Sequence, residues 1–195
     1  LNGGLLSLSY GFGKIQLVLH ESVNGMEQGA VIDLPGIKLL TGVMRGRFNN
    51  EDGQLYVCGM SAWGTNQMMR GGGFYRIRFT GKTLSVPTKM NVHEKHISLD
   101  FDAALDPVSA SDLSNYDVHS WQLLRSKKYG SDRLNQKTLK ITKVQVEGKK
   151  LILHIENLEP VDVITIDYKV RNTKGELLNG SLQGTIHELR QSLGS

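Results

Sequence analysis

The chain has 195 residues, of which 39% are hydrophobic and 22% are charged, and it carries a formal net charge of +4. This length suits one large domain or two small ones, and the apolar content excludes a wholly disordered chain. No window approaches the roughly 18 consecutive apolar residues of a membrane-spanning helix, and basic residues are interleaved with acidic ones, so we expect neither a membrane span nor binding to nucleic acid.

Glycine content divides the chain into two parts near Pro87. Of the 22 glycines, 16 lie in residues 1–85, where short strand-like runs alternate with Gly-rich turns. This rhythm favours antiparallel sheet and no long helix. Asp52-Gly53 supplies the positive backbone angles that a tight hairpin turn requires. The strands expected in this part are Lys14–Val23, Gly29–Leu34, Gly42–Phe48, Gln54–Met60 and Gly73–Phe79.

The second part, residues 86–195, shows apolar residues at alternate positions, which is typical of strands with one buried face. About seven short strands in this length match an immunoglobulin-like β-sandwich, with Tyr116 and Trp121 as central core aromatics. Asp106 and Pro107 have the chemistry of a helix start, so we expect one helical turn after them. The clearest strands are Ile97–Phe101, Leu139–Val146, Leu151–Ile155 and Val163–Val170, and the clearest turns are 147–149 and 172–175.

Several runs resemble a known family. Residues 44–48, 52–59 and 72–81, together with Trp63, resemble the closing blades of the six-bladed, sorbosone-dehydrogenase-like β-propellers of large secreted bacterial proteins. Many of those proteins also carry a c-type haem domain of the planctomycetal type. Residues 97–101, 105–107, 115–116 and 129–131, together with Trp121, resemble the Ig-like domain that follows the propeller.

The resemblance covers nearly the whole chain and sets the expected organisation. It implies an all-β fold, with propeller-type antiparallel strands in residues 1–85 and an Ig-like β-sandwich domain in residues 86–195. It also implies a periplasmic or extracellular location and packing against upstream propeller blades. Because the chain begins at Leu1 without the pattern of a signal peptide, we interpret it as a fragment of a larger protein.

Catalytic and cofactor motifs are not found in the sequence. Gly11–Lys14 lacks the GxxxxGK[ST] spacing of a phosphate loop, and no G-x-S-x-G nucleophile elbow occurs. A lone Cys58, with no CxxC or CxxCH, leaves no thiolate zinc site and no covalent haem attachment. We therefore expect no catalytic residue and no cofactor in these 195 residues.

Histidines could hold a metal ion only where the fold brings them together. His93 and His96 are three residues apart, which on a helix would allow a shared ion. On a strand, positions i and i+3 point to opposite faces, so we expect no metal site there. The remaining histidines are expected to be isolated, without a carboxylate pattern near them: His20, His119, His154 and His187.

Arginines at alternate positions are the candidates for ligand binding. Arg45 with Arg47, and Arg76 with Arg78, are two residues apart, so each pair shares one face of its strand. If the strands are neighbours, four guanidinium groups line one surface, where their donor forks suit the carboxylate or sulfate groups of an acidic glycan. The other interpretation is a solvated sheet face paired with acids such as Glu51 and Asp52.

Two aromatic residues in Gly-rich surroundings complete the candidate ligand-binding set. Trp63 and Tyr75 either form a platform for sugars at a propeller mouth or pack between blades. We expect a non-catalytic structural or interaction region of a secreted multidomain protein, which binds glycan or protein. The alternative is the C-terminal part of a propeller oxidoreductase that acts on sugars and transfers electrons to a c-type haem domain outside this chain.

Overall fold

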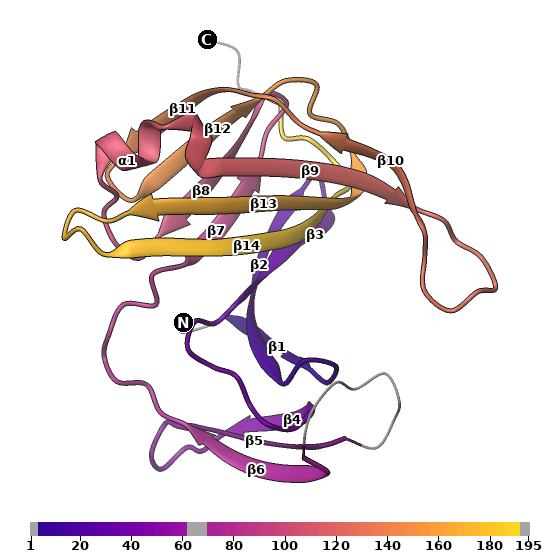
Figure 1. Cartoon of the computed structure of the whole chain (residues 1–195), viewed down its shortest axis with the longest axis vertical. Helices are drawn as coiled ribbons and strands as arrows, with labels where there is room; N and C mark the ends of the chain where they lie inside the picture. Colours follow the sequence, from indigo (N-terminus) through magenta and orange to yellow (C-terminus); the bar gives the residue numbers. More distant parts are fainter. Residues whose placement is uncertain (1–3, 62–69, 192–195) are drawn as a thin grey trace. The chain divides into compact units, whose positions relative to one another are not determined.

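The computed structural model describes residues 4–61 and 70–191. Over these residues the protein is all-β, with antiparallel pairing between strands and one five-residue α-helix (Figure 1). The chain divides into two compact units, each described by itself below. Unit 1 comprises Leu1–Val18 and Asp33–Leu84, and unit 2 comprises Leu19–Ile32 and Ser85–Ser195. Residues 19–32 therefore belong with unit 2, whereas the sequence analysis grouped them with the first part.

Unit 1 contains a strand pair and a three-stranded sheet. β1 (Leu5–Ser9) pairs with the first half of β2 (Lys14–Val23), and the sheet has the order β4-β5-β6. Its strands are β4 (Val43–Phe48), β5 (Leu55–Met60) and β6 (Gly72–Ile77). The predicted Asp52-Gly53 hairpin turn joins β4 and β5, and Gly53 has the positive φ of 65° that this turn requires.

One face of the three-stranded sheet forms the core of unit 1. Val43, Leu55 and Val57 are buried, at 1%, 8% and 1% exposure. A Cβ atom at Gly46 would lie 3.2 Å from side-chain atoms of both Leu8 and Val57, so glycine lets β1 pack closely on this face. The alternate residues of the same strands point to the other face, which is open to solvent.

Unit 2 consists of two antiparallel sheets. One has the order β11-β12-β8-β7, and the other continues from β3 (Met26–Asp33) through β14, β13 and β9 to β10. The remaining elements are β7 (Pro87–Val92), β8 (His96–Phe101), α1 (Pro107–Ser111), η1 (Leu113–Asn115), β9 (Tyr116–Leu123), β10 (Arg133–Thr138), β11 (Ile141–Glu147), β12 (Lys150–Ile155), β13 (Val161–Arg171) and β14 (Leu177–Ile186).

The two sheets of unit 2 pack face to face in a sandwich-like arrangement (Figure 1). The ring of Phe101 on β8 meets the ring of Tyr168 on β13 edge-on, with centroids 5.5 Å apart. The inward residues alternate along each strand, as the sequence pattern predicts, and Tyr116 and Trp121 are buried core aromatics as expected. Other core residues that are almost fully buried are Met90, Ile97, Leu99, Leu151, Leu153, Ile164, Ile166 and Leu182.

Local features of unit 2 confirm three predictions. Asp106 caps α1 by accepting a hydrogen bond from the Ser109 N–H at 3.0 Å, and Pro107 occupies the first turn. The turns at 147–149 and 172–175 join β11 to β12 and β13 to β14. Gly148 and Gly175 have positive φ there. In the part of the chain that is described, no helix is long and apolar enough to cross a membrane.

Candidate functional site

The strand register of unit 1 gathers three of the four predicted arginines on one solvent-facing surface. Tyr56 on β5 is the cross-strand partner of Arg47 on one side and of Arg76 on the other. Cross-strand partners share a face of the sheet, so an aromatic ring lies between two guanidinium groups. Arg45 pairs with Cys58, and Cys58 pairs with Phe74, which forms a second row on the same face.

We call this surface the arginine face and define it by Arg45, Arg47, Tyr56, Phe74 and Arg76. The rings of Tyr56 and Phe74 stack with centroids 5.9 Å apart and an interplanar angle of 28°. Phe74 is 71% exposed, although large apolar side chains are usually buried. The stacked rings therefore present a flat apolar surface bordered by positive charge.

Asp52 is an acidic residue that contacts the arginine face through Tyr56. Its carboxylate accepts hydrogen bonds from the Gln54 N–H at 2.9 Å and from the Tyr56 hydroxyl at 2.8 Å. These two bonds, together with the positive charge of Arg76, hold the pKa of Asp52 below its ordinary value of 3.8. Asp52 therefore stays ionised and orients the Tyr56 ring.

The guanidinium groups of the four predicted arginines form no ion pairs with carboxylates of described residues. Arg47 donates to its neighbouring Gly46 carbonyl at 2.9 Å. None of the ion pairs between described residues involves Arg45, Arg47, Arg76 or Arg78. The pairing with acids that the second interpretation required is thus limited to the electrostatic influence of Arg76 on Asp52.

The other predicted ligand-binding residues lie in different places. Arg78 follows the end of β6 and is exposed, as Arg76 is. Tyr75 pairs with the buried Val57, so its side chain belongs to the opposite, core-facing side of the sheet. Trp63 lies outside the described residues.

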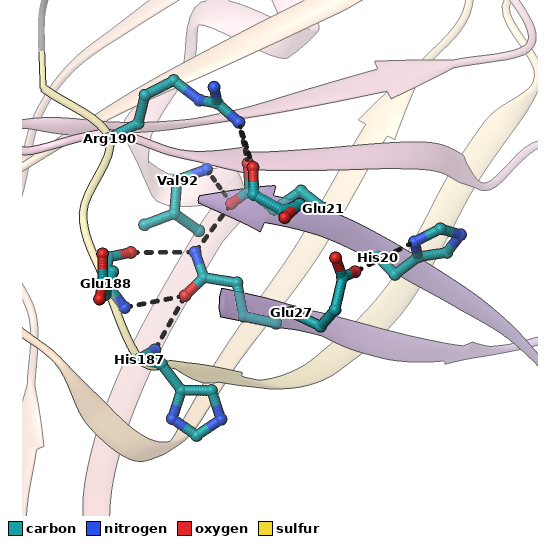
Figure 2. Close-up of polar contacts among 9 residues, drawn as sticks. His20, Glu21, Glu27, Val92, His187, Glu188 and Arg190 are labelled. Carbon is teal, nitrogen blue, oxygen red and sulfur yellow. Dashed lines mark hydrogen bonds and ion pairs between the residues drawn. The ribbon is translucent and has the colours of Figure 1, made fainter. Parts of the chain in front are cut away.

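Unit 2 contains a buried polar network that the sequence analysis did not predict. Glu21, near the end of β2, is only 7% exposed. One of its carboxylate oxygens accepts from the Val92 N–H at 2.8 Å and from Gln28 Nε2 at 2.9 Å, and the other accepts from Arg190 Nη2 at 3.3 Å. Figure 2 shows Glu21 between Val92 and Arg190.

The network attaches the segment that follows β14 to the β2–β3 hairpin. This segment is His187–Arg190, which we call the strap. Gln28 Oε1 accepts from the backbone N–H groups of His187 and Glu188, both at 2.9 Å, and Gln28 Nε2 donates to the Glu188 carbonyl at 2.9 Å. Asn24 Nδ2 donates to the Glu188 carboxylate at 2.8 Å. The β2–β3 hairpin therefore holds the strap through side chains about 160 residues away in the sequence.

The structure corrects the prediction that His93 and His96 point to opposite faces. They flank the turn between β7 and β8, and their rings stack with centroids 4.3 Å apart and an interplanar angle of 14°. The prediction treated 93–96 as one continuous strand, whereas residues on either side of a two-residue turn face each other. His154, expected to be isolated, is the β12 partner of His96, with ring centroids 5.5 Å apart.

We call His93, His96 and His154 the histidine row. In the described part of the chain, no group of three or more His, Cys, Asp or Glu side chains is arranged to hold a metal ion. Burial is the first cause that lowers the pKa of both His93 and His96 below 6.5, and nearby positive groups lower it further. The His93 and His96 imidazoles are therefore largely neutral at neutral pH.

Two other histidines have carboxylate neighbours, contrary to expectation. His119 Nε2 lies 3.0 Å from Asp117 Oδ2, and its Nδ1 lies 3.1 Å from the Thr138 hydroxyl oxygen. His20 Nδ1 lies 3.8 Å from Glu27 Oε2, and both of these side chains are more than half exposed. His119 thus contacts both a carboxylate and the hydroxyl of the exposed Thr138, whereas His20 contacts a carboxylate alone; we assign neither histidine a catalytic role.

Comparisons with known proteins leave the family open. No protein-family model, no curated protein and no solved structure matches this chain.

Proposed function

We propose that this chain is a non-catalytic interaction region of a secreted, periplasmic or extracellular multidomain protein, and that its arginine face binds acidic glycans. The supporting observation is the row in which Arg47 and Arg76 flank Tyr56 across three strands. The two arginines lie two strand spacings apart, about 10 Å, with an aromatic ring between them. This arrangement suits a sugar ring on the aromatic surface, with carboxylate or sulfate groups at each side.

The electrostatics of this face support an anionic ligand. Arg45, Arg47 and Arg76 are exposed and form no ion pair with a described residue, so their donors remain available to a bound anion, apart from the one that Arg47 donates to the Gly46 carbonyl. Guanidinium groups bind carboxylate and sulfate in a bidentate manner that ammonium groups cannot reproduce. A glycan with regularly placed acidic groups would use several arginines at once.

We also propose the finer architecture that the resemblance implies. The β4-β5-β6 meander in unit 1 supports a propeller-blade segment, and the two packed antiparallel sheets of unit 2, with a buried Trp121, support an Ig-like domain. Upstream propeller blades would then be the partner of unit 1. The alternative oxidoreductase role rests on the resemblance, and no contact between described residues favours it over binding.

Calorimetric titration with a uronic-acid or sulfated oligosaccharide tests the binding proposal. Binding should weaken as salt rises, because exposed charges are screened within about 8–10 Å at physiological ionic strength. Replacing Arg47 and Arg76 together by Lys keeps the charge but removes the donor forks, so affinity should fall clearly. Replacing both by Gln should abolish binding.

The matched control changes the same net charge elsewhere. Arg125 and Lys127 are exposed residues of unit 2, and replacing both by Gln should leave affinity unchanged. Equal loss in the control pair would mean that only net charge matters, and the proposed site would be wrong. Unfolding of the Arg47→Gln/Arg76→Gln variant would show that these arginines are structural, and would contradict the proposal as well.

A further inference from the structure

We propose that His93 and the strap form an acid-sensitive latch in unit 2, in which protonation of His93 releases His187–Arg190 from β7 and from the β2–β3 hairpin. The latch is independent of the arginine face. It depends on three observations: the backbone pairing of the strap with the end of β7, the bridge between Arg190 and His93, and the attachment of the strap and β7 to Glu21 through Arg190 and Val92.

The strap is joined to the end of β7 at the residue that would be protonated. Arg190 and His93 form an isolated parallel bridge. The Arg190 N–H donates to the Val92 carbonyl at 3.1 Å, and the Glu94 N–H donates to the Arg190 carbonyl at 3.2 Å. Any separation of the strap from β7 therefore moves Arg190 away from His93.

The side chain of Arg190 carries the electrostatic part of the latch. Its guanidinium donates to Glu21 Oε2 at 3.3 Å and to the Ser22 carbonyl at 3.1 Å (Figure 2). The Glu21 carboxylate also accepts from Val92 and Gln28, so its negative charge is already shared among several donors. A proton on His93 would add a second positive charge beside Arg190 without adding a new acceptor.

The groups around His93 come from every neighbouring element, and positive ones predominate. The stacked ring of His96 is the partner on β8, and His154 on β12 lies beyond it. The turn itself contributes one residue of each charge. The charged groups that act on His93 are Arg190 from the strap, Glu21 from β2 and Lys150 from β12, and the turn residues that follow it in the chain are Glu94 and Lys95.

The lowered pKa of His93 agrees with this geometry. Burial lowers the pKa of His93 most, Arg190 lowers it next, Glu21 raises it, and Lys150 lowers it again. Opening of the strap removes Arg190 and exposes the ring, so the open state binds a proton more readily than the closed state. By linkage, the stability of the closed state relative to the open state is greatest above pH 6.5, the ordinary pKa of histidine. It decreases as the pH falls from there towards the lowered pKa of His93 in the closed state.

Hydrogen exchange of the strap amides in the full chain tests the latch. The reporters are the N–H groups of Glu188 and Arg190, and amides of β13 serve as a reference for global opening. Below pH 6.5, uptake of a proton on opening should reduce strap protection, after correction for intrinsic exchange, by at most about tenfold per pH unit, and the reduction should level off below the lowered native pKa of His93. Protection of the β13 amides also falls over this range, because global unfolding frees both His93 and His96, so the strap amides report the latch where their protection is lower than that of β13.

Two variants decide between the latch and other causes. His93→Gln cannot be protonated in this range, so strap protection should no longer depend on pH. The matched control, His20→Gln, removes an exposed histidine of the β2–β3 hairpin and should keep the wild-type dependence. The same pH dependence in His93→Gln, or none in the wild-type protein, would overturn the proposal.

If the strap were open at every pH in His93→Gln, hydrogen exchange in that variant would not test the latch, so a second measurement is needed. NMR titration of the His93 imidazole should show a higher pKa in Arg190→Gln than in the wild-type protein, because coupling between the two groups is reciprocal. An unchanged pKa would show that Arg190 and His93 are not coupled, and the latch would be refuted.

Discussion

The buried carboxylate of Glu21 allows a quantitative test of the polar network in unit 2. Glu21→Ala removes the acceptor of the Val92 N–H, and one of the two acceptors each of Arg190 Nη2 and Gln28 Nε2. Glu21→Gln keeps a carbonyl oxygen in nearly the same place but removes the charge. A comparison of the two variants separates the hydrogen bonds from the ion pair.

The expected losses differ because the partners differ in burial. Val92 is 0% exposed, so its N–H cannot turn to water once Glu21 is gone, whereas Gln28 Nε2 keeps the Glu188 carbonyl. An unsatisfied buried donor costs about 1–3 kcal/mol, and the vacated side-chain volume adds to it, so Glu21→Ala should cost about 3 kcal/mol. The Arg190 side chain is 43% exposed, so solvent screens the ion pair and Glu21→Gln should cost about 1 kcal/mol.

Urea unfolding at pH 7.5 measures both losses as shifts of the midpoint at constant slope. Glu27→Ala is the matched control, because its side chain is 70% exposed and lies 3.8 Å from an equally solvated His20. That control should change the free energy of unfolding by about 0.5 kcal/mol or less. Equal losses in Glu21→Ala and Glu21→Gln would refute the reasoning, since the acceptor geometry would then contribute nothing beyond the charge.

Three further predictions concern other parts of the structure. Gly29→Ala should lower the free energy of unfolding by about 3 kcal/mol, because its Cβ would lie 1.9 Å from the Leu19 carbonyl oxygen, whereas Gly71→Ala, with open space around it, should be nearly neutral in the same urea assay. Tyr116→Phe should cost about 1 kcal/mol, since the buried hydroxyl donates to the Ala110 carbonyl at 2.6 Å; a loss within error of zero would argue against this bond. Overall stability should fall as the pH drops from 6.5 towards the lowered native pKa values of His93 and His96, and urea midpoints at stepwise pH should lose this dependence in the His93→Gln/His96→Gln variant.

Local features of the fold were predictable because their causes lie within a few residues. Alternating apolar positions located β2 at its observed bounds, Lys14–Val23, and Asp52-Gly53 located the β4–β5 turn. The alternation of Arg45 and Arg47 also predicted a shared face. The row formed by Arg47, Tyr56 and Arg76 was not predictable. It depends on the register between β4, β5 and β6, which a single sequence does not specify.

The turn between His93 and His96 is a local feature that the sequence does not indicate. It contains Glu94 and Lys95, without the Gly, Asn or Pro that usually mark a hairpin, so the pattern suggests a continuous strand.

Contacts between residues far apart in the sequence are not predictable from local patterns. Gln28 contacts the strap across about 160 residues, and no local pattern indicates that pairing. The sequence does contain one signal of this network. Glu21 occupies a position of β2 whose alternate neighbours, Leu19 and Val23, are buried, and a charge buried in a strand requires partners.

The pairing of β3 with β14 has a consequence for synthesis on the ribosome. Gly29–Ile32 of β3 bonds to Leu182–Thr185 of β14, which the ribosome adds about 150 residues later. At roughly 5–20 residues per second, β3 waits on the order of 10–30 s for its neighbour. During that interval its free edge can pair with any other exposed strand. The nascent chain therefore passes through a period of aggregation risk, which ends when β14 emerges and pairs with β3.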